Sequence, residues 1–304
     1  MRVLALPEIR RSLSYPDLIA IMREALAAQG RGECDTPMPM HLAPPGAEVH
    51  IKSSYRQGGR YFVLKIAGTF RANATRGHST STGMMLLSSA ETGEPVGILA
   101  DNGYLTDIRT AAVAAMIARE FGRRDTVLGI LGTGVQARLQ AVLHAEVLQL
   151  RCIFLWGRNP ERADHCAREI RESLPGCDVE VASSPAEVAR AARLMVTATS
   201  SRAPLLDAAD IRPGTHISAI GADSPGKQEL DPAILRRADV ILADSRRQCA
   251  ALGELQHAPD QLGRAIEFTG GPLQVAPDAI TIADFTGLGV EDLYIAEYVH
   301  EHGR

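Results

Sequence analysis

The sequence predicts an α/β protein, with a doubly wound parallel sheet in its larger part and a smaller α+β domain before it. From Thr126 onward, short apolar and β-branched runs alternate with helical stretches, which is typical of parallel β-α-β units. The first 117 residues instead contain strands joined by hairpin turns. We therefore expect one domain over residues 1–117, completed by a C-terminal helix within 290–304, and a second over residues 118–289.

The composition is that of an ordinary globular protein without a charged or membrane-bound partner. Hydrophobic residues make up 45% of the 304 residues, charged residues 22%, and the formal net charge is −4. This balance gives no general attraction to nucleic acid or to an anionic membrane. No apolar run reaches the ~18–20 residues that cross a bilayer, and residues 1–7 lack the apolar stretch of a signal peptide. We expect a cytoplasmic protein that binds neither nucleic acid nor membrane.

The cysteines and histidines do not form a metal-binding pattern. The five cysteines are odd in number and include no C-x-x-C pair, and the nine histidines do not cluster. Free thiols in a reducing compartment and the absence of a metal site are therefore expected.

In the first domain, turn residues separate the expected strands. Gln57-Gly58-Gly59 lies between two of them, and the segment 91–95, which contains Gly and Pro, lies between the next two. An Ala-rich helix at 106–120 then leads into the second domain. The strands are expected at 48–53, 61–67, 83–88 and 96–100.

In the second domain, the expected strands are apolar without period-two alternation, as buried parallel strands are. A helix is expected at 135–150, and another begins at Asn159-Pro160, with Asn as the N-cap and Pro in the first turn. A third lies at 232–238, and the helix at 290–302 is expected to fold back onto the first domain. The strands are expected at 126–132, 151–157, 178–182, 194–199, 216–220, 240–243 and 279–283.

The turn after the first strand of this domain has the pattern of a dinucleotide-binding site. In Gly132-Thr133-Gly134-Val135-Gln136-Ala137, the first glycine permits a tight turn and the second lets backbone approach a pyrophosphate. The helix that follows offers unpaired N–H groups to the phosphates. A Rossmann-type domain is therefore predicted; a tight turn with no ligand is the alternative.

The residue after the second strand bears on which dinucleotide is bound. An NAD-specific site usually carries Asp or Glu there, whereas this sequence has Gly157-Arg158-Asn159. Arg158 is able to pair with a 2′-phosphate through its planar guanidinium. NADP(H) is the preferred cofactor, and NAD(H) is the alternative if Arg158 is only a solvent-exposed arginine.

Several segments in order along the chain resemble the ornithine cyclodeaminase/mu-crystallin family, which includes archaeal-type alanine dehydrogenases and ketimine reductases. The resemblance implies a homodimer of two-domain subunits in which the N-terminal part and the C-terminal helix bind substrate and dimerise. The segments that carry it are Lys65-Ile66-Ala67 with Thr80, Thr106-Asp107-Ile108-Arg109-Thr110-Ala111-Ala112, the glycine turn, Val196-Thr197-Ala198-Thr199-Ser200, residues 221–230 and Thr286-Gly287-Leu288.

The resemblance implies that Lys65 and Arg109 hold the carboxylate of a small amino or imino acid. Each lies in an otherwise apolar segment, where an unpaired cation would be costly. Lys65 is also able to polarise an imine or carbonyl, which gives it a catalytic part as well. The alternatives are a helix-surface arginine and a lysine on a solvent-facing strand edge.

The resemblance further implies that Asp223, just after the strand at 216–220, is the acid/base carboxylate. A helix-capping aspartate beside an ordinary turn is the alternative. The glycines of the turn, Gly132 and Gly134, and Arg158 join a set of expected cofactor contacts. The remaining members, from the family's pattern, are Thr80, Thr110, Val135, Gln136, Thr199, Ile220 and Thr286.

One position departs from the family. Members often carry a further carboxylate-binding arginine ahead of the first strand, where this sequence reads Thr36-Pro37-Met38-Pro39-Met40. Lys52 takes its place if its strand faces the same site; otherwise it is a solvated strand lysine. The change weakens an assignment of strict ornithine specificity.

These residues favour an NAD(P)H-dependent oxidoreductase. It would reduce a small imino acid, such as a cyclic ketimine, or interconvert an amino and a 2-oxo acid, by hydride transfer at the α-carbon. Net reduction fits NADP(H), which Arg158 favours. An ornithine cyclodeaminase with bound NAD is the first alternative, and a non-catalytic NADP-dependent small-ligand-binding protein is the second.

Overall fold

The computed structural model describes residues 1–303, apart from the side chains of Arg71 and Ala74. Arg304, the last residue of the segment expected to carry the terminal helix, lies outside the described residues. Internal contacts divide the chain into a first unit, Met1–Arg109 with Leu288–Arg304, and a second, Thr110–Gly287. The boundary falls inside helix α3 (Tyr104–Glu120), which also contains residue 117, where the sequence placed it.

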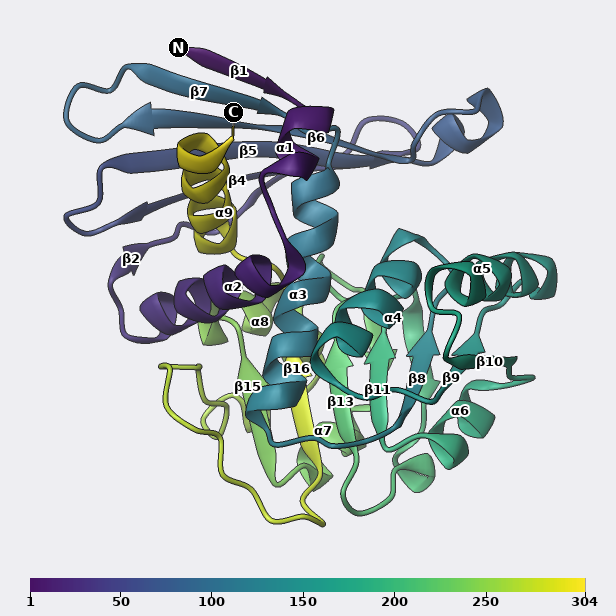
Figure 1. The fold of residues 1–304 in the computed structure, drawn as a ribbon. Helices are drawn as coiled ribbons and strands as arrows, with labels where there is room; N and C mark the ends of the chain where they lie inside the picture. The colour runs from purple at the N-terminus through teal and green to yellow at the C-terminus, as the bar shows by residue number, and fades with distance from the viewer. Residues whose placement is uncertain (304) are drawn as a thin grey trace. The chain divides into compact units, whose positions relative to one another are not determined.

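The first unit is a mainly antiparallel sheet with helices packed on one face (Figure 1). Helix α9 (Gly289–His302) lies along β4, β5 and β6 and also packs on α2 (Tyr15–Gly30), so the terminal helix belongs to this unit. The short helix α1 (Leu6–Arg11) and the 3-10 helix η1 (Arg71–Arg76) complete the unit. In spatial order the strands are β1 (Arg2–Ala5), β7 (Pro95–Ala100), β6 (Ser81–Ser89), β5 (Tyr61–Phe70), β4 (Ala47–Arg56) and β2 (Cys34–Asp35), with β3 (Met40–Leu42) paired to β4.

Both hairpins expected from the turn residues are present, and β4 pairs with β5 in a register that places Lys52 opposite Lys65. Side chains alternate between the two faces of a strand, so these two lysines lie on the same face. The elements before residue 47 were not anticipated. Helix α2 nevertheless has clear start signals, because Ser14 caps it by accepting a hydrogen bond from the Asp17 N–H and Pro16 lies in its first turn.

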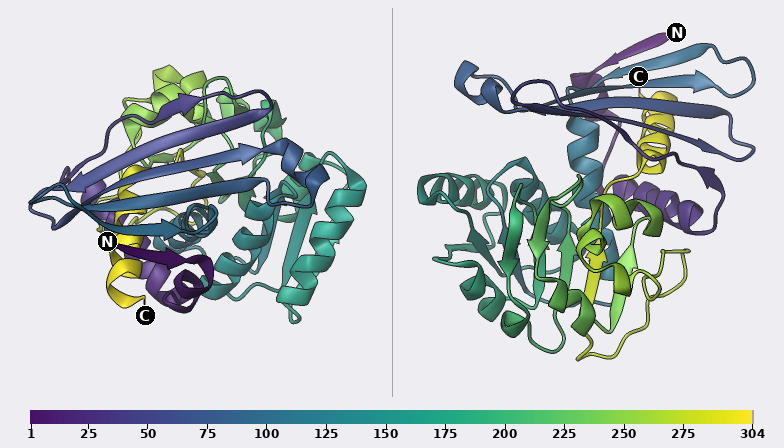
Figure 2. Two further views of the ribbon diagram at one scale, coloured as in Figure 1. Left: turned by 90° about the horizontal axis from the view of Figure 1, so that it is seen from above. Right: turned by 180° about the vertical axis from the view of Figure 1, so that it is seen from behind.

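The second unit is a parallel sheet with helices on both sides (Figures 1 and 2), which confirms the doubly wound prediction. The strand order is β10 (Asp178–Val181), β9 (Cys152–Trp156), β8 (Val127–Leu131), β11 (Leu194–Thr197), β13 (His216–Ala219), β16 (Thr281–Asp284) and β15 (Val240–Ala243). The helices are α4 (Val135–Val147), α5 (Pro160–Ser173), α6 (Pro185–Ala191), α7 (Pro232–Arg237) and α8 (Arg246–Leu252). The unit also contains the short 3-10 helices η2 (Ala208–Asp210), η3 (Glu254–His257) and η4 (Pro259–Gln261).

The chain leaves β8 toward β9 and β10 on one side and then continues with β11 and β13 on the other. This reversal is the switch point at which doubly wound sheets bind ligands, outside the carboxyl ends of the strands. A separate parallel pair, β12 (Arg202–Leu206) with β14 (Gln228–Leu230), also belongs to this unit. None of the helices within residues 1–303 is long and apolar enough to cross a membrane.

Candidate active site

Three cations are buried together in the first unit. Lys52 and Lys65 face each other across β4 and β5, and Arg109 lies in the helix α3. Their exposed fractions are 7%, 1% and 2%, so none is the solvated lysine or helix-surface arginine that the sequence left open. Buried cations require compensating negative charge, since removing an ion from water is costly.

Two carboxylates at the start of α9 supply that charge. Asp292 Oδ2 lies 2.7 Å from Lys65 Nζ, and Asp292 Oδ1 accepts a hydrogen bond from Arg109 Nε at 3.2 Å. Glu291 Oε2 accepts from Arg109 Nη1 at 2.5 Å, while its Oε1 accepts from the Leu288 N–H and caps the helix. Both carboxylates are buried. Asp292 thus holds Lys65 and Arg109 together from one side.

The surroundings change the ionisation of this cluster. Burial, together with the charge of Arg109, lowers the pKa of Lys65 to about 7, although Asp292 opposes the shift. The positive charges of Lys65, Arg109 and Lys52 outweigh burial at Asp292 and lower the pKa of its carboxyl. Burial works against the charge of Arg109, but Glu291 and Asp292 raise the pKa of its guanidinium. Asp292 and Arg109 therefore stay ionised near neutral pH, whereas Lys65 titrates there.

Two further carboxyl groups border the cluster. Burial raises the pKa of Asp107 to about 6 and raises that of Asp101, while the charge of Lys65 acts in the opposite direction on both. Asp101 Oδ2 accepts a hydrogen bond from the Leu105 N–H near the start of α3. The charge of the cluster thus depends on pH near neutrality through Lys65 and Asp107.

The glycine turn of the second unit begins directly after β8. Gly132 has a φ of +134°. A Cβ there would lie 2.5 Å from the Ala198 carbonyl oxygen after β11, so only glycine fits. Gly134 is exposed, and a Cβ built on it would meet nothing within 4 Å. Gly134, the N-cap residue of α4, forms no side-chain cap, and the first turn of the helix directs N–H groups and the positive end of its dipole toward the open space at Gly134.

The two glycines are therefore expected to respond differently to alanine. Gly132→Ala should destabilise the fold by roughly 1–3 kcal/mol, because it forces a strained φ and a clash with backbone. Gly134→Ala should leave the free energy of unfolding nearly unchanged and weaken dinucleotide binding, since its methyl enters the space open to a ligand. Urea unfolding and cofactor fluorescence titration of both variants check this. Equal binding by wild type and Gly134→Ala would remove this turn from the cofactor site.

Loops after the neighbouring strands β11 and β13 are joined by one buried carboxylate. Glu229, in β14, accepts from the Thr199 N–H at 2.6 Å through Oε1 and from the Gly221 N–H at 3.0 Å through Oε2. The Ile220 N–H donates to the Thr197 carbonyl oxygen. These bonds fix Thr199 and Ile220 beside the glycine turn. Glu229 lies in the segment 221–230 that carries the family resemblance, but it was not predicted to have this role, because a single acid in a short strand resembles a surface residue.

Asp244 holds the loop after β16 in the same way. It accepts from the backbone N–H groups of Thr286 and Gly287 and from the hydroxyl of Thr286. Thr286 is buried, and its hydroxyl therefore serves Asp244 in this structure. Its predicted contact with the cofactor stays a prediction.

Asp223 lies in the loop between β13 and β14 and caps no helix there. Its Oδ1 accepts a hydrogen bond from Lys227 Nζ at 2.7 Å and from Ser224 Oγ at 3.1 Å. The exposed fraction of the Asp223 side chain is 36%, and that of Lys227 is 10%. An accessible carboxylate at the carboxyl edge of the sheet is placed to exchange a proton with a ligand bound there.

The remaining predicted contacts are spread over both units. Arg158 follows β9, is exposed, and makes no hydrogen bond or ion pair with residues 1–303. Val135 and Gln136 begin α4. Thr80 precedes β6 in the first unit and accepts from the Phe70 N–H through its carbonyl oxygen, and Thr110 lies in α3.

The structure thus forms two groups from the predicted residues. In the first unit, Lys52, Lys65 and Arg109 form one buried cluster. In the second, the predicted residues lie at the carboxyl ends of adjacent strands, where β8, β11, β13 and β16 end: Gly132, Gly134, Val135, Gln136, Thr199, Ile220, Asp223 and Thr286. The sequence missed Glu291 and Asp292, because acids in the first turn of a helix are ordinary partners of its dipole.

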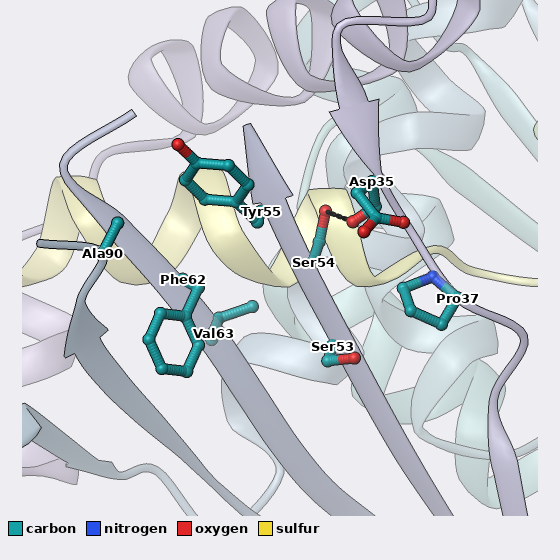
Figure 3. Close-up of a pocket in the computed structure, with 8 residues that line it drawn as sticks. All are labelled: Asp35, Pro37, Ser53, Ser54, Tyr55, Phe62, Val63 and Ala90. Carbon is teal, nitrogen blue, oxygen red and sulfur yellow. Dashed lines mark hydrogen bonds between the residues drawn. The ribbon is translucent and has the colours of Figure 1, made fainter. Parts of the chain in front are cut away.

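A separate pocket of about 370 Å³ lies in the first unit and contains none of the predicted residues (Figure 3). Ser54 Oγ donates to the Asp35 carbonyl oxygen at its wall. It is lined by Asp35, Pro37, Ser53, Ser54, Tyr55, Phe62, Val63 and Ala90. Within residues 1–303, no group of three or more His, Cys, Asp or Glu side chains is arranged to hold a metal ion.

Comparison with known proteins identifies the family that the sequence motifs resemble, and the match extends over residues 2–304. The model of the ornithine cyclodeaminase/mu-crystallin family matches residues 2–304. A protein of Rhizobium meliloti (strain 1021) with a provisional dehydrogenase name is 35% identical over 311 residues, covering 97% of this chain and 94% of its own. Iminosuccinate reductase of Paracoccus denitrificans (strain Pd 1222) is 34% identical over 261 residues, covering 83% and 80%.

A solved structure has the same fold as this chain. The archaeal alanine dehydrogenase dimer with bound NAD superimposes with a TM-score of 0.88 at 28% identity, over 99% of this chain and 95% of that one. The family match covers residues 2–304, and the structure has the parallel sheet, the glycine turn and the buried Lys65 and Arg109 described above. The chain belongs to the ornithine cyclodeaminase/mu-crystallin family.

Proposed function

We propose that this protein is an NAD(P)H-dependent oxidoreductase that reduces a small imino acid, such as the cyclic ketimines pyrroline- or piperideine-2-carboxylate, or interconverts an amino and a 2-oxo acid. The observation that carries the proposal is the buried Lys65 beside Arg109. Relatives in the family include an iminosuccinate reductase and an alanine dehydrogenase, both of which are named for amino- or imino-acid chemistry.

The state of the Lys65 ammonium supports an anionic ligand. Its Nζ is buried and lies 2.7 Å from Asp292, but it makes no hydrogen bond of good geometry with the described residues. A buried ammonium with unsatisfied donors is costly unless a ligand accepts from it. A substrate carboxylate, or the carbonyl or imine group beside it, meets that need, and Arg109 and Lys52 add positive charge.

The glycine turn fits a dinucleotide, because Gly134 leaves open space at the N-terminus of α4. When bound, the nicotinamide supplies the hydride that joins the α-carbon of the imino acid. Lys65, Lys52 and Arg109 bind and orient the carboxylate. Asp223 delivers a proton to the nitrogen, directly or through water, so that an imine becomes an amine.

A substrate panel tests this assignment. Purified protein with NADPH, then NADH, should oxidise the cofactor in the presence of cyclic or acyclic 2-imino acids, as followed by its absorbance. L-Ornithine with NAD is assayed in parallel for ammonia and proline. Ammonia and proline without net change in the cofactor would replace the reductase by a cyclodeaminase, and no turnover with any substrate would favour a binding protein.

The cofactor preference is proposed from Arg158, which follows β9 where no acid is present and whose guanidinium is exposed. A charged hydrogen bond to a 2′-phosphate contributes about 1.5–3 kcal/mol, so NADPH should bind about 10- to 100-fold more tightly than NADH. Arg158→Gln should abolish this difference and leave the dissociation constant of NADH unchanged. Tighter binding of NADH by wild type would assign the site to NAD(H), the cofactor bound in the archaeal alanine dehydrogenase.

Substrate binding should also depend on the ionisation of Lys65. Its pKa of about 7 means that the ammonium loses its proton as the pH rises through neutrality. The affinity for a carboxylate then falls, so kcat/KM should decrease above about pH 7. Lys65→Arg keeps its charge at all these pH values, and we expect it to lose this alkaline decrease. A decrease of the same position in both proteins would assign it to another group.

We also propose a homodimer formed through the first unit. The sheet face opposite α9 carries exposed Leu64, Ile66 and Met84, and no helix of the described unit lies in front of it (Figure 2, left). Exposed apolar patches of this kind mark association surfaces. Sedimentation of wild type should give twice the monomer mass and that of Ile66→Asp the monomer mass; a monomeric wild type would refute the proposal.

A further inference from the structure

We propose that Lys227 is a positioning residue that holds Asp223 for proton transfer. The inference rests on the proposed acid/base role of Asp223 and adds a residue that the sequence did not single out. Lys227 Nζ donates to Asp223 Oδ1 at 2.7 Å. Ser224 Oγ donates to the same oxygen at 3.1 Å, so two donors meet on one side of the carboxylate.

The burial of this ion pair is the reverse of that in an ordinary surface salt bridge. Lysine usually extends its long stem so that the ammonium reaches water. Here the Lys227 side chain is 10% exposed and its partner Asp223 is 36% exposed. The lysine is therefore the more buried partner of the pair, and the aspartate is the more accessible one. A buried lysine that donates to a more accessible aspartate restricts the orientation of that aspartate while leaving it open to a ligand.

The chain segment that carries Lys227 is itself firmly held. Gly226 turns the backbone with a φ of +73°. The Gly226 N–H donates to Gln256 Oε1 at 2.8 Å. The Lys227 carbonyl oxygen accepts from His257 Nε2 at 2.8 Å and from Gln256 Nε2 at 3.2 Å. The 3-10 helix η3 thus anchors the turn by its backbone, so the Lys227 side chain is not needed to fold it.

Other charged groups near this turn bind backbone. Arg202 Nη1 donates to the Pro225 carbonyl oxygen at 3.2 Å. The carboxylate of Glu229 accepts from Thr199 and Gly221, and that of Glu254, from η3, accepts from the Glu229 and Leu230 N–H groups. Lys227 is a cation that contacts Asp223 directly, and Arg202 serves as a matched control on the same turn.

A double-mutant cycle tests the inference in the full-length protein with a turned-over imino acid. Lys227→Met should lower kcat roughly 10- to 100-fold, the range of a charge-assisted hydrogen bond, and leave the dissociation constant of the reduced cofactor and the melting temperature near wild type. In the Asp223→Asn background the same change should have no further effect on kcat. Lys227→Arg should recover part of the loss, and Arg202→Met should retain wild-type kcat.

Several outcomes would overturn the inference. If Asp223→Asn is inactive but Lys227→Met has normal kcat, Lys227 has no positioning role while the function of Asp223 stands. An equal loss from Lys227→Met in both backgrounds would show that Lys227 acts independently of Asp223. Normal kcat in Asp223→Asn would refute the assignment of Asp223 and this inference with it. Lys227→Gln, which keeps a polar group at this buried site, repeats each comparison if the methionine variant does not fold.

Discussion

Asp223→Asn is expected to lower kcat about 10²- to 10⁴-fold, the range that a positioned general acid or base contributes. Asparagine keeps the shape of the side chain and an oxygen that accepts from Lys227 and Ser224, but it cannot deliver a proton. The loop is held by Gln256 and His257 through backbone, so the fold should persist. Steady-state reduction of the imino acid at saturating cofactor measures the loss.

Two further measurements make that result specific. The dissociation constant of the reduced cofactor should change by no more than a few fold, because the glycine turn proposed to bind its phosphates lies after β8 and is not altered. Asp207→Asn is the matched control, since Asp207 only caps the short helix η2 by accepting from the Ala209 N–H. Simultaneous loss of cofactor binding and turnover in Asp223→Asn would assign Asp223 a structural role instead.

Asp292→Asn is expected to cause the largest loss of stability, about 3–5 kcal/mol, because it leaves buried Lys65 and Arg109 without a shared carboxylate. The loss should depend on pH. Well below pH 7 Lys65 is protonated in wild type and variant, so the variant carries the full charge imbalance. Asp292 raises the pKa of Lys65, which is about 7 when Asp292 is present, so this pKa is lower in the variant. Lys65 of the variant therefore loses its proton as the pH rises toward neutrality, and the variant should lose less stability at neutral and alkaline pH than at acid pH.

Urea unfolding of wild type and variant on both sides of neutrality gives the comparison. Glu301→Gln, on the same helix, is the control: Glu301 pairs with Arg60 at 3.3 Å in an exposed ion pair, which contributes at most about 1 kcal/mol. Adding Lys65→Met to Asp292→Asn should restore part of the stability at acid pH. A loss for Asp292→Asn that is equal at all pH values would show that Arg109 alone, and not Lys65, depends on Asp292.

Together these experiments separate the two parts of the proposed mechanism. Asp292 acts on the binding cluster of the first unit, whereas Asp223 and Lys227 belong to the second. Changes at Asp292 should therefore alter stability and the KM of the substrate, and changes at Asp223 should alter kcat.

The sequence by itself determined the features that depend on local residue patterns: the strands of the second unit, the start of α5 and the glycine turn. Apolar runs with Gly and Asn-Pro punctuation predicted the parallel strands and the start of α5, where Asn159 accepts from the Arg162 N–H as an N-cap does. The glycine pattern predicted a tight turn at Gly132. The structure shows that turn, with a φ of +134° that glycine adopts readily and other residues do not. The family resemblance was also carried by local motifs, and the match over residues 2–304 confirms it.

Tertiary structure decided the charge relations. Nothing local in the sequence indicates that Lys52 and Lys65 face each other, because that depends on the register of β4 with β5. Asp292 lies far from Arg109 in the chain and meets it only because α9 returns to the first sheet. Likewise, the reversed burial of Lys227 and Asp223 follows from the anchoring of their turn by η3. Local propensity determines which elements form, but the energy of a buried charge depends on partners that only long-range packing brings within reach.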